Sequence, residues 1–205
     1  MSFNPNFPLK GKTIVVTRAE GQQAEAKERF NAIGANVLDL PALKIGPPDD
    51  WHPLDSALNK LDEFDWLIFS SINGVKAVEE RLQLIGMNLA CRPNSLKIAS
   101  VGKKTAKALM NIGVQTDFTP PDFVADSLIQ HFPAYRAGVK VLLPRVQSGG
   151  RTVLADAFLG AGLTVVEVAA YESNCPDVIP EDTLDAIDKS KVDAVVFTSG
   201  KTALH

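Results

Sequence analysis

"DWLIFSSINGVKA", residues 65–77, reads as a buried strand that runs straight into a helix. Its apolar run ends in Ser70-Ser71, and Asn73-Gly74 follows directly. A strand that leads through a polar turn into a helix is the unit from which parallel α/β sheets are built. Much the same pattern returns in "DAVVFTSGKTALH", residues 193–205, so the chain contains this unit twice.

Short apolar runs alternate with helical patterns on both sides of this stretch. The expected strands are 13–17, 36–40, 66–70, 97–101, 114–118, 140–144, 164–168 and 193–197. Apolar residues three or four positions apart, with a glycine just past the end, predict helices within 23–34, 104–113 and 151–162. Uniformly apolar strands that alternate with helices predict an α/β fold with parallel sheets covered on both faces.

The two halves of the chain resemble each other, because residues 11–43 align with residues 138–171. Three pairs of identical residues are separated by 128 positions: Lys12 and Lys140, Gly34 and Gly162, and Asp65 and Asp193. Arg18 and Arg145 are 127 positions apart, which requires a one-residue gap. A constant offset predicts an internal duplication. The alternative is a periodicity that any parallel α/β fold produces by chance.

The second copy is shorter than the first. It begins at residue 140 and reaches only His205, so "KIASVGKKTAKALMNIG", residues 97–113, has no counterpart. We expect a complete second copy to extend about 60 residues beyond His205. One of the two domains would then be truncated at its C-terminal end.

Composition indicates an ordinary globular protein. Of 205 residues, 45% are hydrophobic and 22% are charged, and the formal net charge is −3. No positive field would attract nucleic acid, no apolar run approaches the roughly 20 residues of a membrane span, and no signal peptide is recognisable. The two cysteines and three histidines lack the spacing of metal ligands. We therefore expect a cytoplasmic protein with no structural metal and no membrane or nucleic-acid partner.

Small polar or basic residues follow five of the expected strands. Ligands of open parallel sheets bind beyond the carboxyl ends of the strands, where helix N-termini favour anions. The five ends are Thr17-Arg18, 70–74, 102–105, Pro144-Arg145 with 148–151, and 198–201. Such residues also cap helices without binding a ligand. Five of them in one chain predict a ligand that carries carboxylates or phosphates.

Nucleotide-binding motifs do not fit these turns. A P-loop needs a glycine five residues before its Gly-Lys pair, and Lys97 and Val195 occupy those positions. No GxGxxG motif follows residues 13–17, and the three scattered histidines provide no Ser–His–Asp set.

The order and spacing of the motifs resemble the uroporphyrinogen-III synthase family over essentially the whole chain. The resemblance rests on "IVVTR" (14–18), "DWLIFSSINGVKA" (65–77), "IASVGKKTAKAL" (98–109), "LLPRVQSGGRTVLADAFLGAG" (142–162), "VVEVAAYES" (165–173) and "DAVVFTSGKTA" (193–203). It implies a hydro-lyase of tetrapyrrole biosynthesis that cyclises hydroxymethylbilane to uroporphyrinogen III and inverts ring D. It also implies that no cofactor is needed, because loss of the substrate's hydroxyl yields a reactive azafulvene.

The resemblance further implies two α/β domains joined by a two-segment hinge. The hinge segments would be 41–46 and 169–174, one domain would hold 47–168, and the other would combine 1–40 with 175–205. Leu43 and Tyr171 are again 128 positions apart, so the repeat places equivalent points in both segments. We expect the protein to be a monomer.

Site residues are carried over position by position. Tyr171 matches the family's cleft tyrosine and is the expected catalytic residue, as a general acid or hydrogen-bond donor. The expected substrate-binding residues are Arg18, Ser70, Ser71, Asn73, Gly74, Gly102, Thr105, Arg145, Arg151, Ser199 and Lys201. Helix capping is the alternative role for the serines and Thr105, and surface ion pairing is the alternative for the cations.

Two other readings remain open. The chain could be a two-lobed α/β module that binds an anionic metabolite without chemistry. It could also be a non-catalytic fragment of the enzyme, because the expected missing end would supply part of one wall of the cleft.

Overall fold

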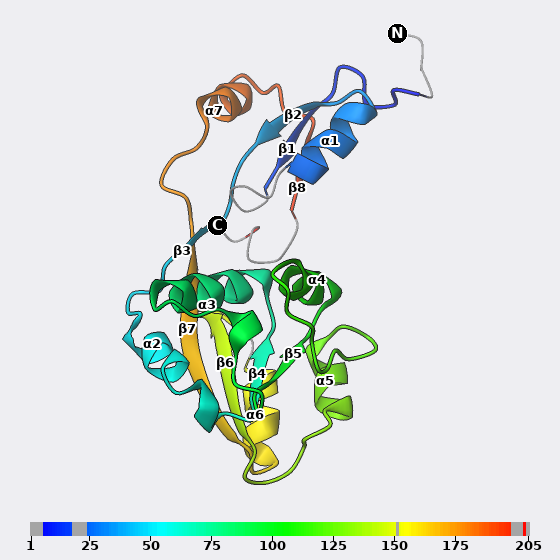
Figure 1. The fold of residues 1–205 in the computed structure, drawn as a ribbon. Coiled ribbons are helices and arrows are strands. Elements are labelled where there is room, and N and C mark those ends of the chain that lie inside the picture. The colour runs from blue at the N-terminus through cyan, green and yellow to red at the C-terminus, as the bar shows by residue number, and fades with distance from the viewer. Residues whose placement is uncertain (1–5, 18–23, 151, 198–202, 204–205) are drawn as a thin grey trace. The chain divides into compact units, whose positions relative to one another are not determined.

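The computed structural model describes residues 6–17, 24–150, 152–197 and 203. The chain divides into two compact units, residues 1–46 with 173–205 (unit 1) and residues 47–172 (unit 2) (Figure 1). Each unit is built on a sheet with parallel strands and packed helices, which confirms the predicted α/β fold.

Unit 2 holds most of a five-stranded sheet with the order β3-β7-β6-β4-β5. The strands are β3 (Lys44–Gly46), β4 (Trp66–Phe69), β5 (Lys97–Ser100), β6 (Lys140–Val146) and β7 (Thr164–Asn174). Strands β5, β4, β6 and β7 pair in parallel, so their carboxyl ends meet at one edge of the sheet. Strand β7 is longer than the expected 164–168 and continues to Asn174.

Helices cover both faces of this sheet (Figure 1). They are α2 (His52–Leu58), α3 (Ile72–Leu84), α4 (Lys103–Asn111), α5 (Ala125–His131) and α6 (Val153–Gly160), with 3-10 turns at Leu61–Glu63 and Leu89–Cys91. Leu67 and Phe69 of β4 belong to the cluster that holds α2 and α3, whereas Trp66 and Ile68 belong to the cluster that holds α5 and α6. All four residues of β4 are buried, which explains why its sequence is uniformly apolar.

Unit 1 contains a three-stranded parallel sheet with the order β2-β1-β8. Its elements are β1 (Thr13–Val16), α1 (Ala24–Ala32), β2 (Asn36–Asp39), α7 (Glu181–Asp188) and β8 (Ala194–Val196). Among the described residues, its main apolar cluster has four buried members: Ile14, Val16, Ala35 and Val37. Val195 of β8 is 43% exposed, so this sheet is less completely covered than the sheet of unit 2.

Equivalent aspartates join the two copies of the repeat inside each unit. In unit 2 the Asp65 N–H donates to the Lys140 carbonyl at 2.9 Å, and the Lys140 N–H donates to the Asp65 carboxylate at 2.8 Å. In unit 1 Asp193 and Thr13 make the same two bonds, at 2.9 and 2.8 Å. Each unit therefore pairs a strand of one copy with a strand of the other. Thr13, not Lys12, is the equivalent of Lys140, so the one-residue gap that Arg18 requires already applies at β1.

The expected strand at 114–118 is not formed. Only one bridge, between Phe118 and Ala99, links this segment to β5. The Asp117 carboxylate accepts the Ile98 N–H at 2.7 Å, so a side chain occupies the donor that a continuing strand ladder would need.

Within the described ranges, no helix combines the length and apolar character that a bilayer crossing requires.

We predict that the two units differ in amide hydrogen exchange. The Val15 and Val16 amides of β1 should exchange faster than the Leu67 and Ile68 amides of β4, because opening unit 1 exposes a smaller apolar core. Exchange monitored by NMR or by mass spectrometry of peptides from the 205-residue chain provides the test. Equal protection of the two strands would show that unit 1 is as stable as unit 2.

Candidate functional site

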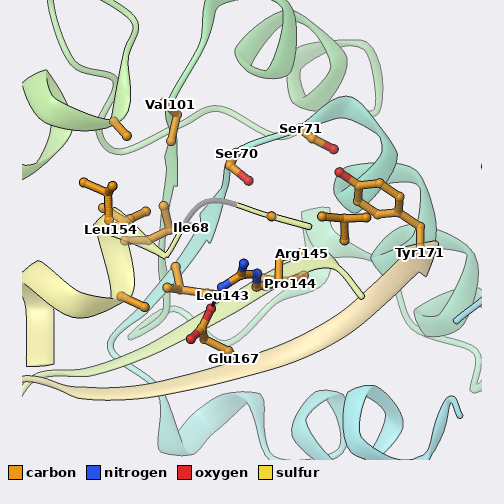
Figure 2. Close-up of a pocket in the computed structure, with 15 residues that line it drawn as sticks. Ile68, Ser70, Ser71, Val101, Leu143, Pro144, Arg145, Leu154, Glu167 and Tyr171 are labelled. Carbon is orange, nitrogen blue, oxygen red and sulfur yellow. Dashed lines mark hydrogen bonds and ion pairs between the residues drawn. The ribbon is translucent and has the colours of Figure 1, made fainter. Parts of the chain in front are cut away.

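A cavity of about 280 Å³ lies in unit 2, at the carboxyl ends of β4, β5 and β6 (Figure 2). Its walls are mostly apolar and include Ile68, Val101, Leu143 and Leu154. Polar groups are few, and they come from Ser70, Ser71, Arg145, Glu167 and Tyr171. Strand ends and the first turns of α3 and α6 therefore surround one space, as expected for the ligand site of a parallel sheet.

The structure brings four of the predicted site residues together at this cavity, namely Ser70, Ser71, Arg145 and Tyr171. Four others lie outside its lining: Asn73, Gly74, Gly102 and Thr105. The remaining four predicted residues, Arg18, Arg151, Ser199 and Lys201, fall outside the described residues.

Ser71 is the N-cap of α3. Its backbone is extended, and its hydroxyl accepts the Gly74 N–H at 3.2 Å. Capping, which the sequence left open as an alternative, is thus one role of this serine. No hydrogen bond donated by this hydroxyl is found among the described residues, so the same side chain retains a donor at the cavity wall.

Gly74 sits buried in the first turn of α3, close to β6. A Cβ atom at this position would make an ordinary contact 3.4 Å from the Pro144 carbonyl oxygen, so a methyl group fits here and a larger, branched side chain would crowd the strand. At the next strand end, Gly102 is the N-cap of α4 through its backbone alone. Thr105 is only 4% exposed and lies within α4, so it packs in the protein interior and does not cap the helix.

Tyr171 stands near the end of β7, with its ring directed toward the side of the cavity that carries Ser71 (Figure 2). The register of β6 and β7 shifts at this point, because Arg145 pairs with Ala169 whereas Val146 pairs with Tyr171. Such irregularities redirect side chains at the rims of sheets. The Gln147 N–H donates to the Tyr171 carbonyl at 2.8 Å, which fixes the backbone of the tyrosine.

Gln147 also ties this strand end to the segment before α2. Its side-chain carbonyl accepts the Asp49 N–H and its amide donates to the Asp49 carboxylate, both at 2.7 Å. No local sequence pattern marks Gln147, because its role depends on a segment 98 positions away.

Arg145 and Glu167 face each other across β6 and β7 and carry the only charges among the described residues that line the cavity. The Arg145 Nη1 group donates to the Glu167 carboxylate, and the two residues form an ion pair. Sequence reasoning missed Glu167. The signal was present, because Glu167 is a single charged residue within the apolar run "TVVEV".

The arrangement can hold a ligand with apolar faces and anionic groups. The apolar walls suit planar rings, and hydroxyls, a guanidinium and helix N-termini suit carboxylates. Among the described residues, no group of three or more His, Cys, Asp or Glu side chains could hold a metal ion.

Comparison with known proteins identifies the family of the chain. A protein-family model described as uroporphyrinogen-III synthase HemD matches residues 24–205. A uroporphyrinogen-III synthase of Synechococcus elongatus is 46% identical over 195 residues, which cover 95% of this chain and 73% of the relative. A putative uroporphyrinogen-III synthase of Methanothermobacter thermautotrophicus is 32% identical, covering 92% of this chain and 74% of the relative.

Solved structures show the same fold. A mutant uroporphyrinogen III synthase from Thermus thermophilus superposes with a TM-score of 0.67 and 18% identity, covering 94% of this chain and 75% of that one. The resemblance noted from the motifs is therefore confirmed, and so is the reaction class that it implied. The chain belongs to the uroporphyrinogen-III synthase family, the hydro-lyases of tetrapyrrole biosynthesis.

Proposed function

We propose that the chain converts hydroxymethylbilane to uroporphyrinogen III, with inversion of ring D, and that the cavity of unit 2 binds part of this substrate. The observation that carries the proposal is the 46% identity to the Synechococcus elongatus synthase over 95% of the chain. The cavity supports it, because its mostly apolar walls and few polar groups match a flexible tetrapyrrole that bears acetate and propionate groups.

The reaction needs positioning more than it needs reactive side chains. Departure of the hydroxyl leaves an azafulvene, and uncatalysed closure then gives the uninverted ring. An enzyme must fold the chain so that attack occurs through the substituted carbon of ring D, and must exclude the simpler closure. Oriented N–H groups, hydroxyls and a guanidinium supply this control by orientation and electrostatic stabilisation.

In this proposal Tyr171 donates a hydrogen bond or a proton to the departing hydroxyl. Ser70, Ser71 and Arg145 bind substrate carboxylates at the same cavity. Gly74 and Gly102 act through backbone geometry at the starts of α3 and α4, and Asn73 and Thr105 contribute from the same turns. Arg18, Arg151, Ser199 and Lys201 complete the proposed set, as the family resemblance implies.

We also propose that the enzyme is a cytoplasmic monomer and that hinge segments 41–46 and 169–174 link its two domains. Light scattering coupled to size-exclusion chromatography tests the oligomeric state directly.

The decisive experiment incubates the 205-residue chain with hydroxymethylbilane and resolves the uroporphyrin isomers after oxidation. We expect isomer III in excess of the isomer I that forms in buffer alone. Isomer I alone would overturn the proposal. Calorimetric binding of uroporphyrin III without isomer III formation would favour a binding module without chemistry.

We predict that Tyr171→Phe lowers kcat by about 10²- to 10⁴-fold, the usual cost of a lost proton donor. Folding should be intact, because the ring is only partly buried and its hydroxyl has no partner among the described residues. Steady-state kinetics with circular dichroism as the folding control test this. A rate within about twofold of wild type would remove Tyr171 from the mechanism.

We predict that Gly74→Val weakens uroporphyrin III binding more than Ser71→Ala does. Loss of the cap costs about 1 kcal/mol of helix stability and leaves the backbone N–H groups in place. A valine would crowd the Pro144 carbonyl, and overpacking of this kind corresponds to about tenfold or more in affinity.

Gly74→Ala is the matched control, because its single added Cβ would make an ordinary contact at 3.4 Å. Fluorescence titration of the three variants ranks their affinities. A larger loss for Ser71→Ala than for Gly74→Val would show that side chains, and not the backbone of the turn, hold the ligand.

A further inference from the structure

The ion pair between Arg145 and Glu167 lies on the cavity wall (Figure 2). The two side chains are 21% and 34% exposed. Arg145 uses Nη1 for Glu167, and its remaining N–H groups have no partner among the described residues. A guanidinium has five donors in a fixed plane, so one anchored donor orients the others.

Gly150 leaves the space that the same guanidinium occupies on another side. A Cβ atom at Gly150 would lie 2.6 Å from Arg145 Nη2 and 3.2 Å from Nε, so the arginine occupies the space that any side chain would need. The backbone of Gly150 does not have a positive φ, unlike that of Gly149, so space and not backbone conformation calls for glycine here. The pocket lining includes all three residues.

We propose that Glu167 and Gly150 are positioning residues that hold Arg145 in the orientation in which it binds a substrate carboxylate. This inference rests on the proposed function and explains how one of the proposed binding groups, Arg145, is oriented before the substrate binds. An arginine that is already oriented loses less side-chain freedom when the carboxylate arrives, which tightens binding by about three- to tenfold. Bidentate recognition of a carboxylate by a guanidinium also requires a fixed plane.

Whether neutralising Glu167 weakens or strengthens substrate binding distinguishes a positioning role from a simple effect of its charge. Glu167 is an anion beside a site for anions, so electrostatics alone predicts that its neutralisation strengthens binding. Positioning predicts the reverse. High ionic strength reduces the charge effect, because the Debye length falls to about 3 Å at 1 M salt, whereas the loss of orientation persists.

The first measurement compares Glu167→Gln with wild type in steady-state turnover of hydroxymethylbilane at low and high salt. We expect KM to rise about three- to tenfold at both salt concentrations, with kcat within about twofold. Glu167→Asp, which keeps the charge, should recover part of the loss. A KM that is unchanged or lower at high salt would overturn the proposal.

A double-mutant cycle tests whether Glu167 acts through Arg145. Arg145→Met alone should raise KM at least as much as Glu167→Gln does. In the Arg145→Met background, Glu167→Gln should have no further effect, because the group that it positions is gone. Additive effects would show that Glu167 touches the substrate itself, which contradicts a positioning role.

Arg81 and Asp55 provide the matched control. This pair also joins an arginine to a carboxylate within unit 2, and its side chains are 23% and 33% exposed, but it does not line the cavity. Asp55→Asn should leave KM unchanged whatever it does to thermal stability. If Asp55→Asn raised KM as much as Glu167→Gln, the effect would be one of general stability.

Gly150→Ala gives an independent test that leaves both charges in place. The added methyl would displace the guanidinium, so KM should again rise while Glu167 remains ionised. Calorimetric titration with uroporphyrin III reports the same loss without turnover. If the wild-type chain forms no isomer III, the proposed function fails. If the wild type is active and both Gly150→Ala and Glu167→Gln have the KM of the wild type, only the positioning proposal fails.

Discussion

The two hydrogen bonds between Asp65 and Lys140 set the register on which the site depends. They align β4 with β6, so that Trp66 pairs with Val141 and Leu67 with Leu142. A slip by one residue would turn each side chain of β4 toward the opposite cluster, exchanging Trp66 and Ile68 with Leu67 and Phe69. Because the register is held, β4 and β6 end beside each other, and Ser70 and Arg145 reach one cavity.

The ion pair between Arg145 and Glu167 suggests how the proposed site would bind an anionic substrate with few cations. A guanidinium in a mostly apolar wall is costly when it is unpaired, and Glu167 offsets that cost while fixing its direction. The starts of α3 and α6 add positive potential through backbone N–H groups, without adding net charge. Small residues at these turns would let the backbone approach the proposed ligand, while the N-cap of Ser71 and the packing of Gly74 against Pro144 serve the fold.

The strands and the cavity edge could be predicted from local patterns, because an apolar run that ends in polar residues specifies both a buried strand and the place where it stops. Ser70, Ser71 and Arg145 were found in this way, since carboxyl ends of parallel strands share one edge, whereas Tyr171 was indicated by the family resemblance alone. The prediction of a strand at 114–118 was wrong, because a local pattern cannot show that the Asp117 carboxylate accepts the Ile98 N–H. Glu167 and Gln147 were missed because their roles depend on the register of β6 against β7 and on Asp49. The single charge within "TVVEV" marks Glu167 as unusual, but it does not show which residue Glu167 pairs with.

The two copies of the repeat exchange strands, and this exchange affects the order in which the two units can assemble. In unit 2, β4 of the first copy pairs with β6 of the second, and β6 pairs with β7, so neither copy can complete the sheet alone. Unit 1 needs Thr13 to meet Asp193 across 180 positions of chain. The sheet order places β3 beside β7, so folding of unit 2 brings the two segments of unit 1 together and shortens the effective loop. The Lys12 ammonium and the Thr13 N–H then bond the Asp193 carboxylate and hold its pKa below the ordinary value, which favours the charged form that makes this closing contact. The unit that carries the cavity is therefore the one that can form first, and its fold creates the conditions in which the second sheet closes.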